Sequence, residues 1–216
     1  MKKVNKILVN SNIDINNSIN DLNTKDSKIN LNVYGESTLY IVNQNIENLV
    51  INMKDNSKLD IYIYNVCKLK YIEINQTSNS SINFNYSYVN EGDNYLEVVN
   101  NIEDDNNKTN ILIKNISNNG LSSIVVRANI NKSSKDNYLS ESVKGIITHG
   151  YIEIDPIIVC DSNEVEANHS ATISGVDTEQ VNYLMSKGLS EKLSSELVMN
   201  GFIKSNMDDY IKEFYN

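Results

Sequence analysis

The stretch "INLNVYGESTLYIVNQNIENLVINMKDNSKLDIYI", from Ile29 to Ile63, carries the pattern that runs through most of this chain. It contains four short segments, beginning near residues 29, 39, 49 and 59, in which apolar residues alternate with Asn, Asp, Lys or Tyr. Alternation with a period of two is typical of strands that have one buried face. Each segment is therefore expected to be a short strand whose apolar side chains point into a core.

The spacing of the strands then loosens but continues, with further starts near residues 72, 82, 96 and 111. Turn-forming runs such as "KDNS", "SNSS" and "EGDN" separate them. Near-constant spacing indicates a structural repeat. A sandwich or barrel of hairpins would also give short strands at this spacing, but Asn119-Gly120 is the single Asn-Gly hairpin signal in the strand-rich part of the sequence, before Gly175.

We therefore predict a mainly β protein built as a solenoid, or β-helix, in which each strand stacks on an earlier one around one elongated core. The residues expected to fill that core share the inward phase of the alternation. They include Leu31, Leu39, Ile51, Ile61, Ile63, Ile74 and Phe84.

The alternation stops after Gly175, where helical patterns begin. Asp177 with Gln180 three residues later is typical of a capping box, and Gly188 is a suitable stop for the helix that follows. The apolar stripe expected on this first helix consists of Val181, Leu184 and Met185.

A second helix is expected from Ser190, as N-cap, to a stop at Gly201, with Leu193, Leu197 and Val198 facing inward. A third short helix is expected near the end of the chain, and its apolar side would carry Met207, Tyr210, Ile211 and Phe214. We therefore divide the chain into a β-helix over residues 1–168 and a C-terminal helical domain over residues 169–216.

The composition excludes several classes of function. The formal net charge of the 216 residues is -9 and Arg127 is the sole arginine, so the chain lacks the clustered basic residues that nucleic acids require. No apolar run is long enough to span a membrane, and the first apolar run is too short for a signal peptide. Cys67 and Cys160 stand far apart, without metal-site or disulfide spacing. We expect a cytoplasmic protein with no nucleic-acid or membrane partner.

Catalytic and nucleotide-binding motifs are also missing from the sequence. There is no phosphate-binding Gly-rich loop, no dinucleotide fingerprint and no nucleophile elbow. We therefore expect a protein that is not an enzyme and has no nucleotide site of its own.

Residues from about 145 to 203 carry a series of small motifs whose order and spacing are specific together. The series consists of Pro156, His169, Ala171-Thr172, Gly175, Asp177, Tyr183-Leu184, Ser186-Lys187-Gly188 and Gly201-Phe202. It resembles the C-terminal part of SufB/SufD-type proteins, the scaffold subunits of the Suf iron–sulfur cluster assembly machinery. Two positions depart from the family pattern: Ala167 stands where many SufD-like members place a cysteine, and Lys187 replaces an arginine.

The resemblance implies a right-handed parallel β-helix with a helical C-terminal domain, and a scaffold role in iron–sulfur cluster assembly. It implies binding to a Suf-type ABC ATPase through the helical domain, and pairing with a like or unlike chain of the family through the last strands. The residues expected to contact a partner are Tyr183, Leu184, Lys187, Gly188 and Phe202. The expected cofactor is a transient iron–sulfur cluster.

His169 is the first candidate metal ligand, because the resemblance implicates the family histidine in holding the cluster and a neutral imidazole can bind iron. Glu166 and Cys160 are further candidates from their proximity in sequence and their donor atoms. The structural alternatives stay open: His169 would fill a turn between strand and helix, and Cys160 would be a small buried strand residue. The rival functions are a self-associating solenoid that binds no metal and, less compatible with a single arginine, a β-helix carbohydrate-active enzyme.

Overall fold

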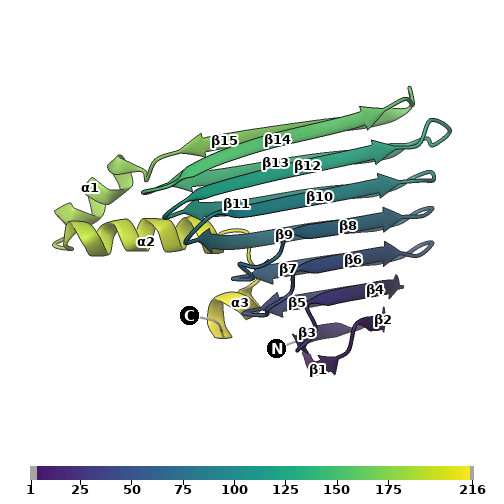
Figure 1. The fold of residues 1–216 in the computed structure, drawn as a ribbon, viewed down its shortest axis with the longest axis horizontal. Coiled ribbons are helices and arrows are strands. Elements are labelled where there is room, and N and C mark those ends of the chain that lie inside the picture. Colours follow the sequence, from purple (N-terminus) through teal and green to yellow (C-terminus); the bar gives the residue numbers. More distant parts are fainter. Residues whose placement is uncertain (1–3, 215–216) are drawn as a thin grey trace.

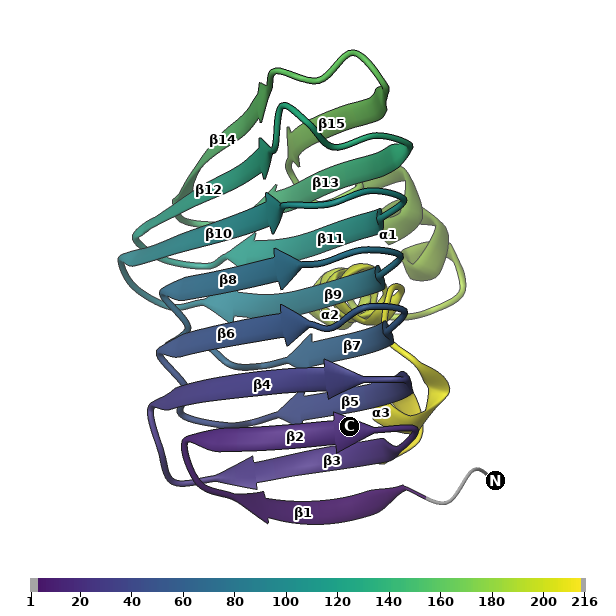
Figure 2. The same cartoon turned by 90° about the vertical axis from the view of Figure 1, so that its right-hand side faces the viewer.

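The computed structural model describes residues 4–214, and this part of the chain forms a solenoid of two facing β-sheets (Figures 1 and 2). Successive strands alternate between the sheets, so that odd-numbered strands form sheet A and even-numbered strands form sheet B. Neighbouring strands within each sheet pair in parallel. The predicted solenoid is confirmed, and a barrel or sandwich of antiparallel hairpins is excluded.

Sheet A contains β1 (Asn5–Val9), β3 (Ile19–Thr24), β5 (Glu36–Val42), β7 (Lys58–Tyr64), β9 (Ser81–Asn90), β11 (Lys108–Ser117), β13 (Asn137–Ile147) and β15 (Val165–Ser174). Sheet B contains β2 (Asn12–Asn16), β4 (Lys28–Tyr34), β6 (Asn48–Met53), β8 (Tyr71–Gln76), β10 (Asn94–Ile102), β12 (Leu121–Ile130) and β14 (Tyr151–Cys160).

The inward-facing side chains of both sheets meet in one continuous core. All seven residues predicted to fill it belong to a single cluster and have 0% exposed surface. Burial of large apolar side chains supplies most of the favourable free energy of such a fold.

The coil widens from the N-terminal end to the C-terminal end. Residue 5 pairs with residue 20 in the first turn of sheet A, whereas residue 108 pairs with residue 138 in a late turn. The strands also become longer along the chain, from five residues in β1 to ten in β11. The spacing of ten residues in the sequence is therefore that of half a turn in the narrow part of the coil, and it breaks down as the turns grow.

Asparagine shapes the corners of the coil. The positive-φ residues other than glycine are Asn17, Asn43, Asn56, Asn65, Asn79, Asn106 and Asp136. Asn and Asp tolerate the left-handed conformation better than other side chains that carry a Cβ. Corner asparagines of successive turns also bond to each other, as where the Asn65 Nδ2 donates to the Asn43 Oδ1 at 2.6 Å. The chain can therefore make tight corners with few glycines.

A second set of asparagines forms a ladder along the outer face of sheet B. The side-chain amides donate in sequence from Asn129 to Asn101, Asn75, Asn52 and Asn32, and the last donates to Asp14 at 2.8 Å. Each bond joins residues that are register partners in neighbouring strands. A one-residue slip of β4, β6, β8 or β10 would break two of these bonds, so the ladder reinforces the register that the core sets.

Three helices follow the last strand: α1 (Thr178–Ser186), α2 (Glu191–Lys204) and α3 (Asp209–Phe214). The Asp177 carboxylate accepts hydrogen bonds from the backbone N–H groups of Glu179 and Gln180, which confirms the predicted cap. Gly188 has a φ of 94° just past α1, and Ser190 caps α2. Among residues 4–214, no helix combines the length and apolar character needed to cross a membrane.

Three details differ from the sequence-based expectation. The helix α2 continues through Gly201 to Lys204, because Ile203 in its last turn is buried against Ile116 and Ile146 of sheet A. Leu193 and Leu197 do not face inward but are 43% and 45% exposed. The strand β15 extends to Ser174, so the expected domain boundary after residue 168 falls inside a strand.

The helical unit folds back along sheet A. The helix α2 packs against β9 and β11, where the Lys114 ammonium donates to the Phe202 carbonyl at 3.1 Å and to the Ser205 hydroxyl. The helix α3 lies further along the sheet (Figure 1), and its Ile211, together with Met207 just before the helix, is buried against Tyr40 and Val42 of β5. The C-terminal end of the chain therefore covers part of the outer face near the N-terminal strands.

Candidate functional site

His169 lies in the middle of β15, the last strand of the solenoid, and not in a turn. The expectation of a turn rested on the small residues around it, but these continue the alternation of a strand. The residues of β15 that share the face of His169 are Val165, Ala167, Ala171 and Ile173. They are register partners of the buried, inward-facing residues of β13, yet no later strand within residues 4–214 covers them, and four of the five, including His169, are exposed.

Glu141 of β13 is the register partner of His169. Its side chain is 1% exposed, and neither carboxylate oxygen has a hydrogen-bond partner within the described part of the chain. Burial raises the pKa of this carboxyl from 4.5 to about 7. An ionised carboxylate that is buried without hydrogen-bond donors costs folding free energy. The position therefore favours binding of a proton, a cation or a hydrogen-bond donor by this carboxylate.

The two residues end a column of side chains that runs through the core. In register from β7 to β15 this column consists of Ile61, Phe84, Ile111, Glu141 and His169. Neighbouring strands are separated by about 4.8 Å, so the two residues are neighbours in the column, although no hydrogen bond joins the imidazole to the carboxylate in the described part of the chain. The column is apolar for three turns and ionisable for the last two.

This pair fits a metal ion such as iron in the type of its donor atoms. An imidazole nitrogen and a carboxylate oxygen are both suitable ligands for iron, and the unpartnered Glu141 oxygens have no competing protein donor among the described residues. One chain supplies two such side chains, which is fewer than a metal ion needs. Within residues 4–214, no three His, Cys, Asp or Glu side chains converge on one point.

The other two predicted ligands are not brought to His169. Glu166 is three residues away in the same strand, and an odd separation in a strand places the two side chains on opposite faces. Cys160 is exposed at the end of β14, where its thiol donates to the Ser162 carbonyl at 3.4 Å. The loop after Cys160 leads into β15 at Val165, and His169 lies four residues further along that strand, about 13 Å from its start. The strand therefore carries His169 away from the loop that follows Cys160.

Sequence reasoning missed Glu141, although a signal was present. In "YLSESV" the glutamate occupies the inward phase between Leu139 and Val143, where an apolar residue is expected. A charged residue at an inward-facing position indicates either that this face is exposed to solvent or that the residue belongs to a buried functional site. The last turns contain many residues, so Glu141 and His169 are far apart in the sequence although they lie one full turn apart in the solenoid.

The predicted partner-binding residues divide into two groups. Tyr183 is 62% exposed, with the Lys187 ammonium 5.3 Å from the centre of its ring, and Gly188 follows at the exposed end of α1. Leu184 is half-buried. Phe202, by contrast, packs against sheet A beneath the Lys114 ammonium, so it holds α2 in place.

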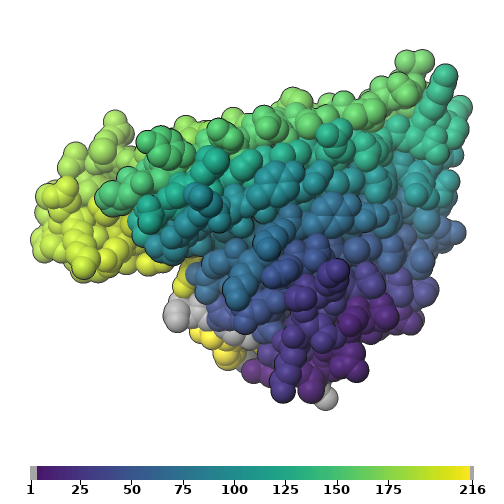
Figure 3. Space-filling model, viewed as in Figure 1, coloured from purple at the N-terminus to yellow at the C-terminus, as the bar shows by residue number. Residues whose placement is uncertain are grey.

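The projecting helices carry four large, exposed apolar side chains. They are Tyr183 and Met185 of α1 and Leu193 and Leu197 of α2. We call these four residues the helical patch. Figure 3 shows α1 and the start of α2, in yellow-green, as a lobe that extends beyond the ends of the strands.

Fold and site together define a class: a parallel β-solenoid with an uncovered last turn, an ionisable pair at that turn and a short helical unit behind it. Comparison with known protein families identifies the family to which this chain belongs. Residues 43–202 match the SufBD core domain of the SUF system of FeS cluster assembly, and the chain belongs to this family.

Several curated relatives agree with this assignment. The chain is 34% identical over 77 residues to the iron–sulfur cluster assembly protein SufD of Bacillus subtilis, a match that covers 36% of this chain and 16% of the relative. It is 31% identical over 80 residues to a SufBD family protein of Pyrococcus horikoshii, covering 31% of this chain and 18% of the relative. A SufBD family protein of Methanocaldococcus jannaschii is 36% identical over 64 residues, covering 30% and 19%. The matched segments thus span less than a fifth of each of these relatives.

Proposed function

We propose that this chain is a cytoplasmic scaffold subunit in iron–sulfur cluster assembly, without catalytic activity of its own, which presents iron-binding side chains at the uncovered end of its solenoid. The observation that carries this proposal is the buried, unpartnered carboxylate of Glu141 beside His169. Membership of the SufBD family supports the role in cluster assembly.

Pairing of two chains completes the site in this proposal. The strands β14 and β15 are the last of their sheets, so each leaves an unpaired backbone edge, and edges of this kind readily pair with another chain. The inward-phase side chains of β15 are small or apolar and suit a packed interface. Because His169 is the fifth of ten residues in β15, antiparallel pairing of this strand with its own copy places both imidazoles near the two-fold axis.

The paired state would supply two imidazoles and two carboxylates, a ligand set that suits iron. The iron and its cluster are cargo in this scheme: these residues hold the metal, and the partner chain shields it from water. An unlike chain of the same family could supply thiolates in place of the second histidine, and the same edge would serve.

An ABC-type ATPase is the second proposed partner, and the helical patch is its proposed docking surface. The exposed apolar side chains of α1 and α2 support this assignment. The bonds from Lys114 to the last turn of α2 tie the helical unit to β11, whose neighbour β13 carries Glu141. A pull on the helices would therefore be transmitted to the strands that hold the metal site.

Pairing is tested by analytical ultracentrifugation of the full chain and of Ala171→Arg, which places a charge on the uncovered face of β15. We expect a dimer for the native chain and a monomer for Ala171→Arg. The matched control is Asp105→Arg, in an exposed loop between β10 and β11, which should remain dimeric. A native chain that is monomeric even with an equimolar second SufBD chain would contradict the proposal.

Docking is tested separately, by co-purification with the ATPase encoded beside a SufBD gene. The double variant Leu193→Glu, Leu197→Glu should lose the ATPase while keeping its melting temperature, since both side chains are already exposed. Lys192→Glu on the same helix controls for charge alone. Retention of the ATPase by the double variant would place the docking surface elsewhere.

A further inference from the structure

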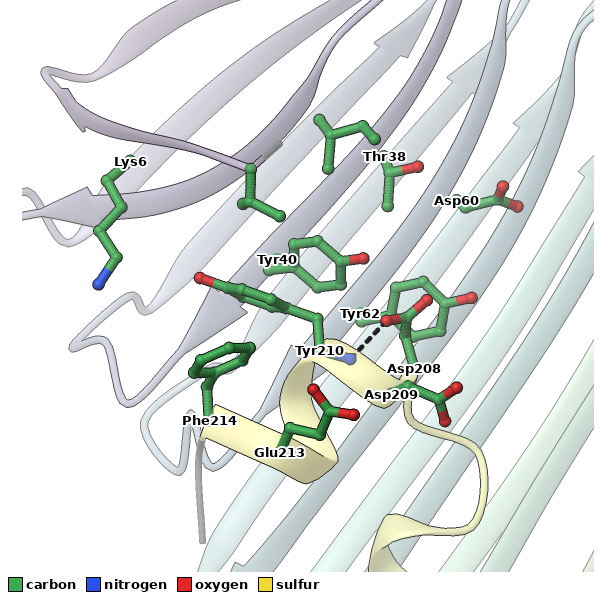
Figure 4. Close-up of a pocket in the computed structure, with 12 residues that line it drawn as sticks. Lys6, Thr38, Tyr40, Asp60, Tyr62, Asp208, Asp209, Tyr210, Glu213 and Phe214 are labelled. Carbon is green, nitrogen blue, oxygen red and sulfur yellow. Dashed lines mark hydrogen bonds between the residues drawn. The ribbon is translucent and has the colours of Figure 1, made fainter. Parts of the chain in front are cut away.

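A cavity of about 840 Å³ lies far from the metal site, between α3 and the outer face of the N-terminal strands of sheet A (Figure 4). Its volume is in the range of small-molecule sites. The helix α3 forms one side of it, and side chains of β1, β3, β5 and β7 form the other. The proposed scaffold role does not use this region.

Aromatic rings form the wall of the cavity. Tyr40 and Tyr62, on neighbouring strands, are stacked with centroids 5.7 Å apart. The ring of Tyr210 lies 4.6 Å from that of Tyr40, and Phe214 continues the series at 5.2 Å from Tyr210. The faces of such rings carry partial negative charge and attract cations, most strongly where water is partly excluded.

Carboxylates surround these rings. Asp60 comes from β7, and Asp208, Asp209 and Glu213 come from α3 and the residue before it, whereas Lys6 is the one basic residue of the lining among residues 4–214. Burial together with the Asp208 carboxylate raises the pKa of Tyr40, so this phenol stays protonated. The cavity therefore combines π-faces with an excess of negative charge.

This combination selects the chemistry of the ligand. A bare metal ion would need several converging donors, and no group of three His, Cys, Asp or Glu within residues 4–214 provides them. An alkylammonium ion suits both parts of the lining: its methylene groups pack on the rings and its cationic nitrogen bonds to carboxylates. We propose that this cavity binds an alkylammonium group.

The test is isothermal titration calorimetry of the full chain with spermidine at physiological ionic strength. We expect saturable binding that Tyr62→Leu, which keeps an apolar side chain but removes the π-face, weakens about tenfold. The exposed Asp209→Asn should weaken it about threefold. Glu103→Gln, an acidic residue of a distant loop, is the control and should leave the affinity unchanged.

A second titration, with Nα-acetyl-lysine methylamide, identifies the source of the alkylammonium group. Affinity equal to that of spermidine indicates the lysine side chain of a protein, and much weaker binding indicates a free polyamine. The proposal is overturned if neither compound binds, if Tyr62→Leu binds spermidine as the native chain does, or if Mg²⁺ at equal charge displaces spermidine completely.

Discussion

Glu141 and His169 are register partners on adjacent parallel strands, and the carboxylate is the buried member of the pair. Glu141 lies in the strand next to β15, and His169 lies in β15 itself, the last strand of sheet A in the described part of the chain. A solenoid that used this column for packing alone would continue the apolar side chains of the preceding turns. At this end of the solenoid, ionisable side chains take the positions that apolar side chains fill in the preceding turns. This replacement is what makes the end a candidate site.

The first prediction concerns the pH dependence of stability. Because burial raises the pKa of Glu141 to about 7, the folded chain keeps a proton that the unfolded chain loses near pH 4.5. The metal-free protein should therefore lose stability as the pH rises from 4.5 to about 7, by on the order of 3 kcal/mol. Urea unfolding across this range should show the loss in the native chain but not in Glu141→Gln. Identical pH profiles for the two proteins would show that Glu141 does not titrate as described; the exposed Glu166→Gln is the control.

The second prediction concerns the core. Ile61 has no exposed surface and lies between Leu39 and Phe84 in the stack of side chains. Ile61→Ala should lower the free energy of unfolding by about 2–4 kcal/mol through the cavity it leaves. Leu8→Ala, at a side chain that is 80% exposed, should change it very little. Denaturant unfolding measures both, and equal effects would argue against the described core.

The third prediction concerns the asparagine ladder. The Asn52 amide donates to Asn32 and its oxygen accepts from Asn75, each at 3.1 Å. Asn52→Ala breaks both bonds and should destabilise the chain by about 1–2 kcal/mol. Asn45→Ala, at an exposed corner residue, provides the comparison in the same unfolding experiment. No difference between the two variants would mean that the ladder is only a surface pattern.

The fourth prediction concerns the attachment of the helical unit. Lys114 is the buried cation that donates to the carbonyl of Phe202 at the end of α2. Lys114→Ala should speed amide hydrogen exchange in α2 and α3 while leaving the amides of β6 and β8 protected. Lys144→Ala, at an exposed position of β13, should leave both regions as in the native chain. Uniformly faster exchange in Lys114→Ala would instead indicate a role in the solenoid itself.

Much of the fold follows from the sequence because its strongest signal is periodic. Leu39, Ile61 and Phe84 can be assigned to the core from the period of two alone, and Asp177 can be assigned as a cap from local chemistry. Gly201 could not be assigned correctly, because packing of Ile203 on sheet A outweighs the weak helix preference of glycine. Tertiary contacts of this kind carry no local signal.

The candidate site was predictable only in part. The family pattern pointed to His169, but proximity in sequence pointed to Glu166, which the strand turns to the opposite face. Its actual neighbour, Glu141, is reached through the register of β13 and β15, and this register depends on the length of a whole turn. Because the turns of this solenoid widen along the chain, no fixed period in the sequence could give that pairing.

The most direct test of the central claim is the amount of iron that the paired chain retains after anaerobic reconstitution and desalting, measured by elemental analysis. The account predicts that the native chain retains iron in its paired state, and that His169→Ala and Glu141→Gln each retain much less while their pairing and melting temperatures below pH 4.5 stay close to the native values. Glu166→Gln should retain as much iron as the native chain. Equal retention of iron by all four proteins, or none by the native pair, would contradict the assignment of His169 and Glu141 as the metal site.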